Sequence, residues 1–414
     1  MLRSRSEILR LPCALLGLLG CTTAAMAQEA QAPSAEAGGW IDALARGQAW
    51  VRFRYRFEEV EQQGFAEDAH ASTLRSVLGY RTDAWHGLHG TIEFENVTAL
   101  GNDLYDSTTN GETSRPLVAD PEDTEVNQVY LEASGNLGAR LGRQVITFDD
   151  HRFVGDVGWR QNQQTFDALR LDGSGTERTK LVYAFVDNAN RIFGDDSPQG
   201  DLRMSSHLLN ASFDGGELGK VVAHWYRLDF DDLPGVSTST LGLRYAGKLA
   251  LGERWSLRGT LAAAHQEDVG DNPTEVGAGY FLGELGADRG GVGATLGYEV
   301  LDGSRSRPGD KFTTPLATLH RFQGWADLFL TTPDAGVEDL YLSLSGKHER
   351  LEWAGVWHEF SAEAGSADYG SELDLLAIWT CSRRVRVGVK LADYEAEDFA
   401  GDTRKAWAWV ELTP

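Results

Sequence analysis

Strict alternation of apolar and polar side chains constrains the fold of this chain more than any other sequence feature. It is clearest in the segment GQAWVRFRYRFEEV at residues 47–60. In that segment the apolar Val51, Phe53, Tyr55 and Phe57 alternate with the charged Arg52, Arg54, Arg56 and Glu58. Because successive side chains leave a pleated strand on opposite faces, this period of two predicts a β-strand with one apolar face and one basic face.

Two fold classes place these faces in different environments. In a soluble β-sandwich the apolar row enters a core and the arginines meet bulk water. In an outer-membrane β-barrel the apolar row contacts lipid and the arginines line a water-filled lumen. One strand fits both folds, so the rest of the chain has to distinguish them.

Short alternating segments recur along the whole chain. Roughly eighteen of them are several to about ten residues long, a length that suits a tilted membrane-crossing strand. The clearest lie at 88–95, 126–133, 240–247, 255–264, 291–300, 339–346 and 384–392, whereas 139–146, 164–171 and 205–213 have mixed parity. The sequence therefore predicts an all-β fold, a transmembrane antiparallel β-barrel of eighteen strands.

The connections between these segments alternate in length. Long connections are predicted near 58–71, 98–125, 147–163, 187–204, 301–338, 361–370 and 393–403, and short turns such as SGNLG, DGGELG and GADRGG lie between them. Outer-membrane barrels have short periplasmic turns on one rim and long external loops on the other. A soluble sandwich has no reason to sort its connections in this way, so the pattern favours the membrane barrel.

The first residues resemble an export signal. Arg3, Arg5 and Arg10 are followed by the apolar stretch LPCALLGLLG and by an A-x-A site that ends at Ala27. We therefore expect a signal peptide at 1–27, a periplasmic lead-in at 28–46 and the barrel at 47–414. A lipoprotein signal ending at Cys21 is a poorer alternative.

Composition and motifs exclude several function classes. The formal net charge of −24 argues against nucleic acid as a partner. Apolar runs in the barrel region are too short for a transmembrane helix. None of the common hydrolase, nucleotide-binding or zinc-protease motifs is present, so we expect no enzyme activity, no cofactor and no metal site. The adjacent Asp149, Asp150 and His151 are a weak metal candidate, because neighbours on an extended chain converge poorly.

Basic side chains are the candidate functional residues. They alternate with apolar residues in the strand segments, whereas acidic residues concentrate in the loop at 101–125. The predicted pore-lining set on strands is Arg52, Arg54, Arg56, Arg75, Arg244, Arg258, Arg386 and Lys390. Since Glu93, Glu95, Glu132 and Asp339 face inward by the same parity, we expect a mixed lumen with a local basic bias.

Three longer segments resemble the alginate export family of outer-membrane barrels. They are LGRQVITFDDHRFVGDVGWRQNQQTFDALRL at 141–171, TPLATLHRFQGWADLFLTTPDAGVEDLY at 314–341 and GYEVLDG at 297–303. The resemblance implies a monomeric eighteen-stranded barrel that conducts an anionic uronic-acid polysaccharide through a lumen lined with arginine and lysine. By motif, it adds Arg143, Arg152, Arg160 and Arg170 to the pore-lining candidates.

These observations predict a channel in the cell outer membrane. We expect it to pass anionic sugars or other small organic anions by diffusion, because a basic wall in a narrow aqueous pore lowers the barrier for anions. A porin for a neutral or cationic solute is the first alternative, favoured by the overall acidity. A soluble periplasmic carbohydrate-binding protein or lyase is the second. The sequence leaves open whether 141–171 and 314–341 fold into the lumen.

Overall fold

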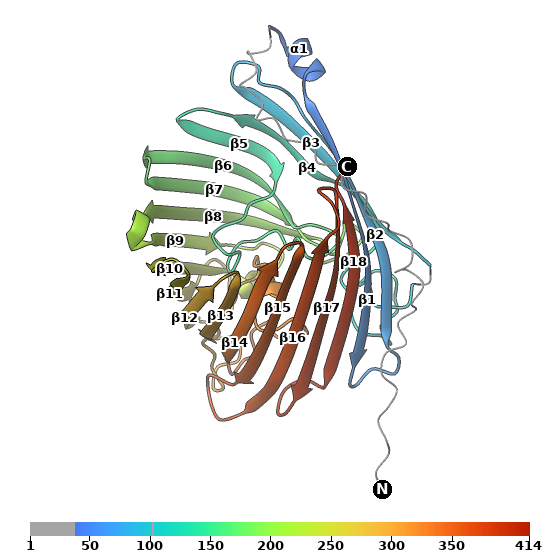
Figure 1. Cartoon of the computed structure of the whole chain (residues 1–414), viewed down its shortest axis with the longest axis vertical. Coiled ribbons are helices and arrows are strands. Elements are labelled where there is room, and N and C mark those ends of the chain that lie inside the picture. Colours follow the sequence, from blue (N-terminus) through green and yellow to red (C-terminus); the bar gives the residue numbers. More distant parts are fainter. Residues whose placement is uncertain (1–37, 102) are drawn as a thin grey trace.

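The described residues form one closed antiparallel β-barrel. The computed structural model describes residues 38–101 and 103–414, and its eighteen strands form a single sheet. Sequence neighbours pair throughout, and β1 also pairs with β18, which closes the sheet on itself (Figure 1). The prediction of an eighteen-stranded barrel is therefore confirmed. The signal peptide expected at 1–27 lies outside the described residues.

Most strands have 10–15 residues, long enough for a tilted crossing of the hydrocarbon layer. The first nine strands are β1 Gln48–Gln62, β2 Ala69–Arg81, β3 Leu88–Ala99, β4 Asp123–Ala133, β5 Leu137–Gln144, β6 Thr165–Thr176, β7 Thr179–Asn190, β8 Asp201–Asp214 and β9 Lys220–Leu228. The other nine are β10 Thr238–Leu251, β11 Trp255–Asp268, β12 Gly277–Arg289, β13 Val292–Leu301, β14 Val337–His348, β15 Leu351–Ser361, β16 Asp368–Thr380, β17 Val385–Ala396 and β18 Thr403–Leu412. The helical elements are α1 Trp40–Ala45 and the 3-10 turns η1 Gly216–Leu218, η2 Pro234–Val236 and η3 Leu319–Arg321.

Connections sort by length between the two rims. Two residues separate β6 from β7, β12 from β13 and β14 from β15. On the other rim, the long connections 100–122, 145–164 and 302–336 join β3 to β4, β5 to β6 and β13 to β14. The predicted alternation is confirmed for these connections, whereas 63–68, 362–367 and 397–402, which were predicted to be long, are no longer than the turn 82–87 on the opposite rim. By the rule for outer-membrane barrels the long loops lie on the extracellular side.

The outer surface of the barrel carries apolar side chains. On β10, Leu241 and Leu243 are more than half exposed, whereas Thr240 and Gly242, which alternate with them, are buried. In water such a row would be a large exposed apolar patch, whereas in a membrane the lipid chains keep it away from water. In the opening segment, Phe53 belongs to this outer row and Arg54 to the inner one.

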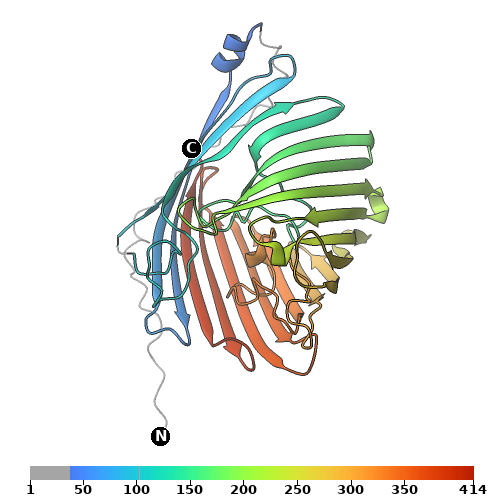
Figure 2. The same ribbon diagram turned by 180° about the vertical axis from the view of Figure 1, so that it is seen from behind.

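Two long loops fold back into the barrel instead of standing above it (Figure 2). Loops 145–164 and 302–336 meet at a bridge between Val154 and Leu316, and both side chains are fully buried. Around them the inward-facing aromatic side chains of the strands form an apolar core inside the lumen. The lumen is therefore narrowed by packed loops, which resolves the question that the sequence left open.

The short helix α1 precedes β1 and lies at the rim of the short turns (Figure 1). The hydroxyl of Tyr80 on β2 donates a hydrogen bond to the carbonyl oxygen of Leu44 and fixes the end of this helix. Among the residues described, no helix has both the length and the apolar character needed to cross a membrane.

Candidate functional site: a charged lumen wall and two inward loops

Alternation on β1 places three arginines in one inward row, and this row holds loop 145–164. Arg54 donates hydrogen bonds to Gln161 Oε1 at 2.8 Å and to the carbonyl oxygen of Gly158 at 2.8 Å. Arg56 is 1% exposed and bonds Asp120 and the carbonyl oxygen of Trp159. Arg52, nearer the periplasmic rim, contacts Glu93 at 2.6 Å and keeps a partly exposed side chain.

Arg152 links the two inward loops to the wall. Its Nε contacts Glu299 Oε1 of β13 at 2.6 Å, and its terminal nitrogens donate to Thr314 at 3.1 Å and Gln323 at 3.2 Å. The side chain is fully buried, with the guanidinium over the ring of Phe322. Arg152 was predicted to line the pore, but its burial removes it from contact with a passing solute.

A second buried cluster fixes the tip of loop 302–336. The carboxylate of Asp327 contacts Arg160 at 2.8 Å, Lys405 at 3.0 Å and His320 Nδ1 at 2.6 Å. Arg160 also contacts Glu58 of β1 at 3.3 Å. Like Arg152, the predicted pore-lining Arg160 is buried and holds a loop in place.

Lys390 is a cation without a carboxylate in salt-bridge contact among the described residues. Its Nζ lies 2.7 Å from His320 Nε2, 3.7 Å from the centre of the Trp325 ring and 4.5 Å from that of Trp159. Burial lowers the pKa of His320 to about 3, so the imidazole is neutral and its Nε2 accepts the hydrogen bond from Lys390. Aromatic faces and one imidazole thus surround this amino group.

The remaining strand candidates are each paired with an acid but keep contact with water. Arg258 contacts Asp288 at 2.8 Å with 41% of its side chain exposed, and Arg386 lies 3.6 Å from both Glu352 and Glu411. The others in this group are Arg75 with Glu95, Arg170 with Asp172 and Arg244 with Asp150. The wall is therefore a network of ion pairs rather than a continuous basic surface.

Arg143 differs from its prediction. On β5 it lies opposite Val129 of β4 and beside Asp167 of β6, two residues after the outward-facing Leu141. The register thus places it in the outer row, where it contacts Asp167 at 3.0 Å. The motif alone had suggested a lumen position, and the mixed parity of this short strand concealed the outward direction.

Three cross-strand pairs bring like charges together on the lumen face. The register places Arg54 opposite Arg75, Arg140 opposite Arg170 and Lys248 opposite Arg258. Arg140 and Lys248 were not among the sequence candidates. Their parity was readable, but the opposition depends on strand register, which the sequence does not give directly.

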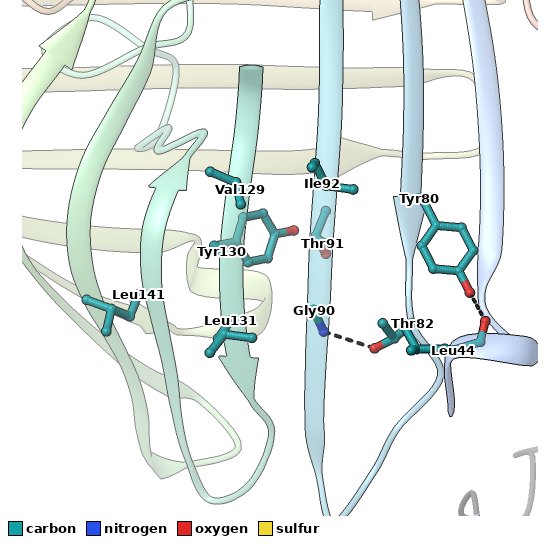
Figure 3. A pocket seen from close by; sticks show the side chains of 10 residues that line it. All are labelled: Leu44, Tyr80, Thr82, Gly90, Thr91, Ile92, Val129, Tyr130, Leu131 and Leu141. Carbon is teal, nitrogen blue, oxygen red and sulfur yellow. Dashed lines mark hydrogen bonds between the residues drawn. The ribbon is translucent and has the colours of Figure 1, made fainter. Parts of the chain in front are cut away.

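A shallow apolar pocket on the outer face is separate from this site (Figure 3). Its lining includes Leu44 from α1 and the outward-facing Ile92, Leu131 and Leu141 from β3, β4 and β5. Since these side chains belong to the lipid-facing row, the pocket is part of the membrane surface and not of the lumen.

A closed barrel of this size, with an apolar belt outside and a charged lumen inside, defines an outer-membrane channel of the porin class. The family model described as "Alginate export" matches residues 47–299, more than half of the chain. The protein therefore belongs to the alginate export family, as the sequence motifs had indicated. This family and fold are those of channels and not of enzymes, and they locate the protein in the outer membrane.

Solved porin structures show the same fold at low sequence identity. OccAB4 of Acinetobacter baumannii has a TM-score of 0.71 at 10% identity, with 89% of this chain and 98% of that chain covered. OccK9 (OpdG) of Pseudomonas aeruginosa has a TM-score of 0.69 at 13% identity, covering 90% and 100%. OpdL of the same organism has a TM-score of 0.66 at 15% identity, covering 90% and 99%. No curated protein sequence matches the chain.

Proposed function

We propose that this barrel is a passive diffusion channel for small organic anions, including short anionic sugars. The supporting observation is the set of like-charged pairs on the lumen face, Arg54–Arg75, Arg140–Arg170 and Lys248–Arg258. Like charges directly opposite one another on a sheet are unfavourable. Arg54 is committed to loop 145–164, so the two pairs that stay partly exposed, Arg140–Arg170 and Lys248–Arg258, are the ones that attract an anion when one is present. Arg52 and Arg386 continue the same exposed wall.

Acidic partners set how tightly an anion is held. Asp288 contacts Arg258, and Asp172 contacts Arg170, so neither guanidinium is free to hold a solute alone. Conduction requires sites that are attractive enough to enter and weak enough to leave. A paired basic wall meets both requirements.

The inward loops support small solutes over a polymer. Loops 145–164 and 302–336 occupy part of the lumen and are fixed to the wall by Arg152, Arg160 and Asp327. A long polysaccharide would need these buried contacts to open, whereas a small anion needs only a narrow path beside them. The polysaccharide cargo suggested by the family resemblance is thus the weaker form of the proposal.

Reversal potentials in a KCl gradient across a planar bilayer test the proposal. We expect the wild-type channel to prefer Cl⁻ over K⁺, and the double variant Lys248→Gln/Arg258→Gln to lose much of that preference. The change should be larger at 0.01 M than at 1 M salt, because screening shortens from about 30 Å to about 3 Å.

A matched control removes two arginines from outside the lumen. Arg203 and Arg404 are exposed, lie in outward rows and are paired with Asp232 and Asp393. The variant Arg203→Gln/Arg404→Gln loses the same charge and should keep wild-type selectivity. A wild-type channel that prefers K⁺ would instead support the alternative of a cationic or neutral solute.

A further inference from the structure

Three carboxylates meet where a long loop crosses the extracellular end of β4. Asp123 and Glu125 lie on β4, and Asp195 lies on the loop 191–200 between β7 and β8. One oxygen from each lies within 4.8 Å of the others. The backbone nitrogen of Asp195 also donates to Asp123 Oδ2 at 2.9 Å, so the loop is seated on the strand at this point.

Glu125 makes this group more than a solvated acidic patch. The residue is 7% exposed, and its carboxylate takes part in none of the hydrogen bonds or salt bridges among the described residues, although its oxygens are not fully shielded from solvent. Across the strand it faces Glu95, which is already bound by Arg75. Arg143 attracts it from nearby, but both ends of that guanidinium are committed to Asp167.

A carboxylate on a largely buried side chain with no protein partner is costly, and neighbouring acids add to the cost. The carboxyl groups of Asp123 and Asp195 lie beside it and repel it. The arrangement therefore lacks a positive charge at its centre.

We propose that Asp123, Glu125 and Asp195 bind a calcium ion. Calcium takes oxygen ligands at about 2.3–2.6 Å, so two ligand oxygens on opposite sides of one ion lie about 5 Å apart. The oxygens of this group fall within that limit. Three carboxylates supply three negative charges, and water completes the six to eight ligands that calcium requires.

Bound calcium clamps loop 191–200 to the barrel wall. The same loop also contains Ile192. Its carbonyl oxygen accepts a hydrogen bond from Asn162 of the inward loop 145–164 at 3.4 Å. Asn162 also donates to the carbonyl oxygen of Pro121 at 3.1 Å, just before β4. The calcium site therefore stabilises the outer edge of the loop that narrows the lumen.

Binding is measured on barrel refolded in detergent, free of lipopolysaccharide and stripped with EDTA. Titration calorimetry with CaCl₂ should detect one site. Glu125→Gln and Asp195→Asn should each weaken binding by at least tenfold, and the second variant leaves the barrel wall unchanged. The control Asp271→Asn, at an exposed position of the connection 269–276, should bind calcium as the wild type does.

Thermal unfolding gives an independent readout. Calcium should raise the unfolding midpoint of the wild type and of Asp271→Asn but not of Glu125→Gln. In EDTA the order reverses, because Glu125→Gln removes a repelled carboxylate and should unfold at a higher temperature than the wild type. Absence of calcium binding in the wild type, or unchanged affinity in both cluster variants, would overturn the site.

Discussion

Asp327 is the residue on which the inner loops depend most. Its buried carboxylate contacts Arg160, Lys405 and His320, which come from a loop, a strand and its own loop. Removing one partner from a buried ion pair leaves uncompensated charge and costs about 3–5 kcal/mol. We therefore expect Asp327→Asn to destabilise the barrel by about that amount, measured by urea unfolding in detergent.

A surface ion pair provides the comparison for that variant. Asp334 contacts Lys311 at 2.9 Å with half of its side chain exposed. Exposed pairs contribute only about 0–1 kcal/mol, so Asp334→Asn should change the free energy of unfolding little. Similar losses for the two variants would contradict the buried role of Asp327.

His320 predicts an acid-sensitive loop. Burial lowers its pKa from 6.5 to about 3 in the folded protein, so the folded state takes up its proton less readily than the unfolded state. The stabilisation is complete above about pH 6.5 and is lost as the pH falls toward 3. The thermal unfolding midpoint should be lower at pH 4.5 than at pH 7.5. This decrease should be smaller in His320→Gln than in the wild type. An equal fall in both proteins would show that other groups control the acid response.

The parity of single residues was predictable, but their partners were not. Alternation alone placed Arg52, Arg54 and Arg56 inward, because direction follows from the pleat. It could not indicate that Arg56 is covered by Asp120 from a loop 64 residues further along the chain. Burial of a charged side chain depends on such distant contacts.

At the scale of one strand, β14 offers a direct test of the two faces. Leu342 is about half exposed on the outer row, and its neighbour Ser343 lies on the inner row opposite Thr295. Arginine at the lipid midplane costs about 2–4 kcal/mol, whereas lumen positions tolerate it. Leu342→Arg should reduce the yield of assembled barrel strongly and Ser343→Arg only slightly, as measured by heat-modifiable gel mobility. Equal yields would contradict the assigned faces.

Not every inward-facing position accepts a larger side chain, as Gly388 on β17 shows. Val387 and Val389 face lipid, as their alternation predicted, and Gly388 faces the lumen. However, the indole of Trp409 from β18 lies directly over Gly388, so a side chain there would collide with it. The sequence identified the face on which Gly388 lies. It did not indicate that the Trp409 indole packs over it, because that contact comes from the neighbouring strand.

Loops were the element that the sequence described least completely. Their lengths and positions were predictable from the turn residues and from the ends of alternation. Their direction was not, since loops 145–164 and 302–336 are drawn inward by contacts such as Arg152 with Glu299, 147 residues apart. An isolated loop sequence contains no such information.

The whole barrel should resist detergent until it is heated. Each strand pairs with two neighbours in a closed ladder, so no edge is available from which unfolding can begin. We expect the purified protein to migrate in SDS as a compact species at room temperature and as an extended chain after boiling. Recovery as a detergent-free soluble monomer would contradict the membrane barrel.

The joining of the first strand to the last also dictates an order of events during biogenesis. Ten residue pairs, from Phe53 with Leu412 to Gln62 with Thr403, connect β1 to β18 across nearly the whole chain. Contacts between such distant segments form slowly, because the intervening chain must be gathered first. The seam cannot close until the ribosome has released the final residues. The polypeptide must therefore cross the periplasm before the barrel is closed, as an aggregation-prone intermediate. It depends on chaperones until β1 and β18 pair in the membrane.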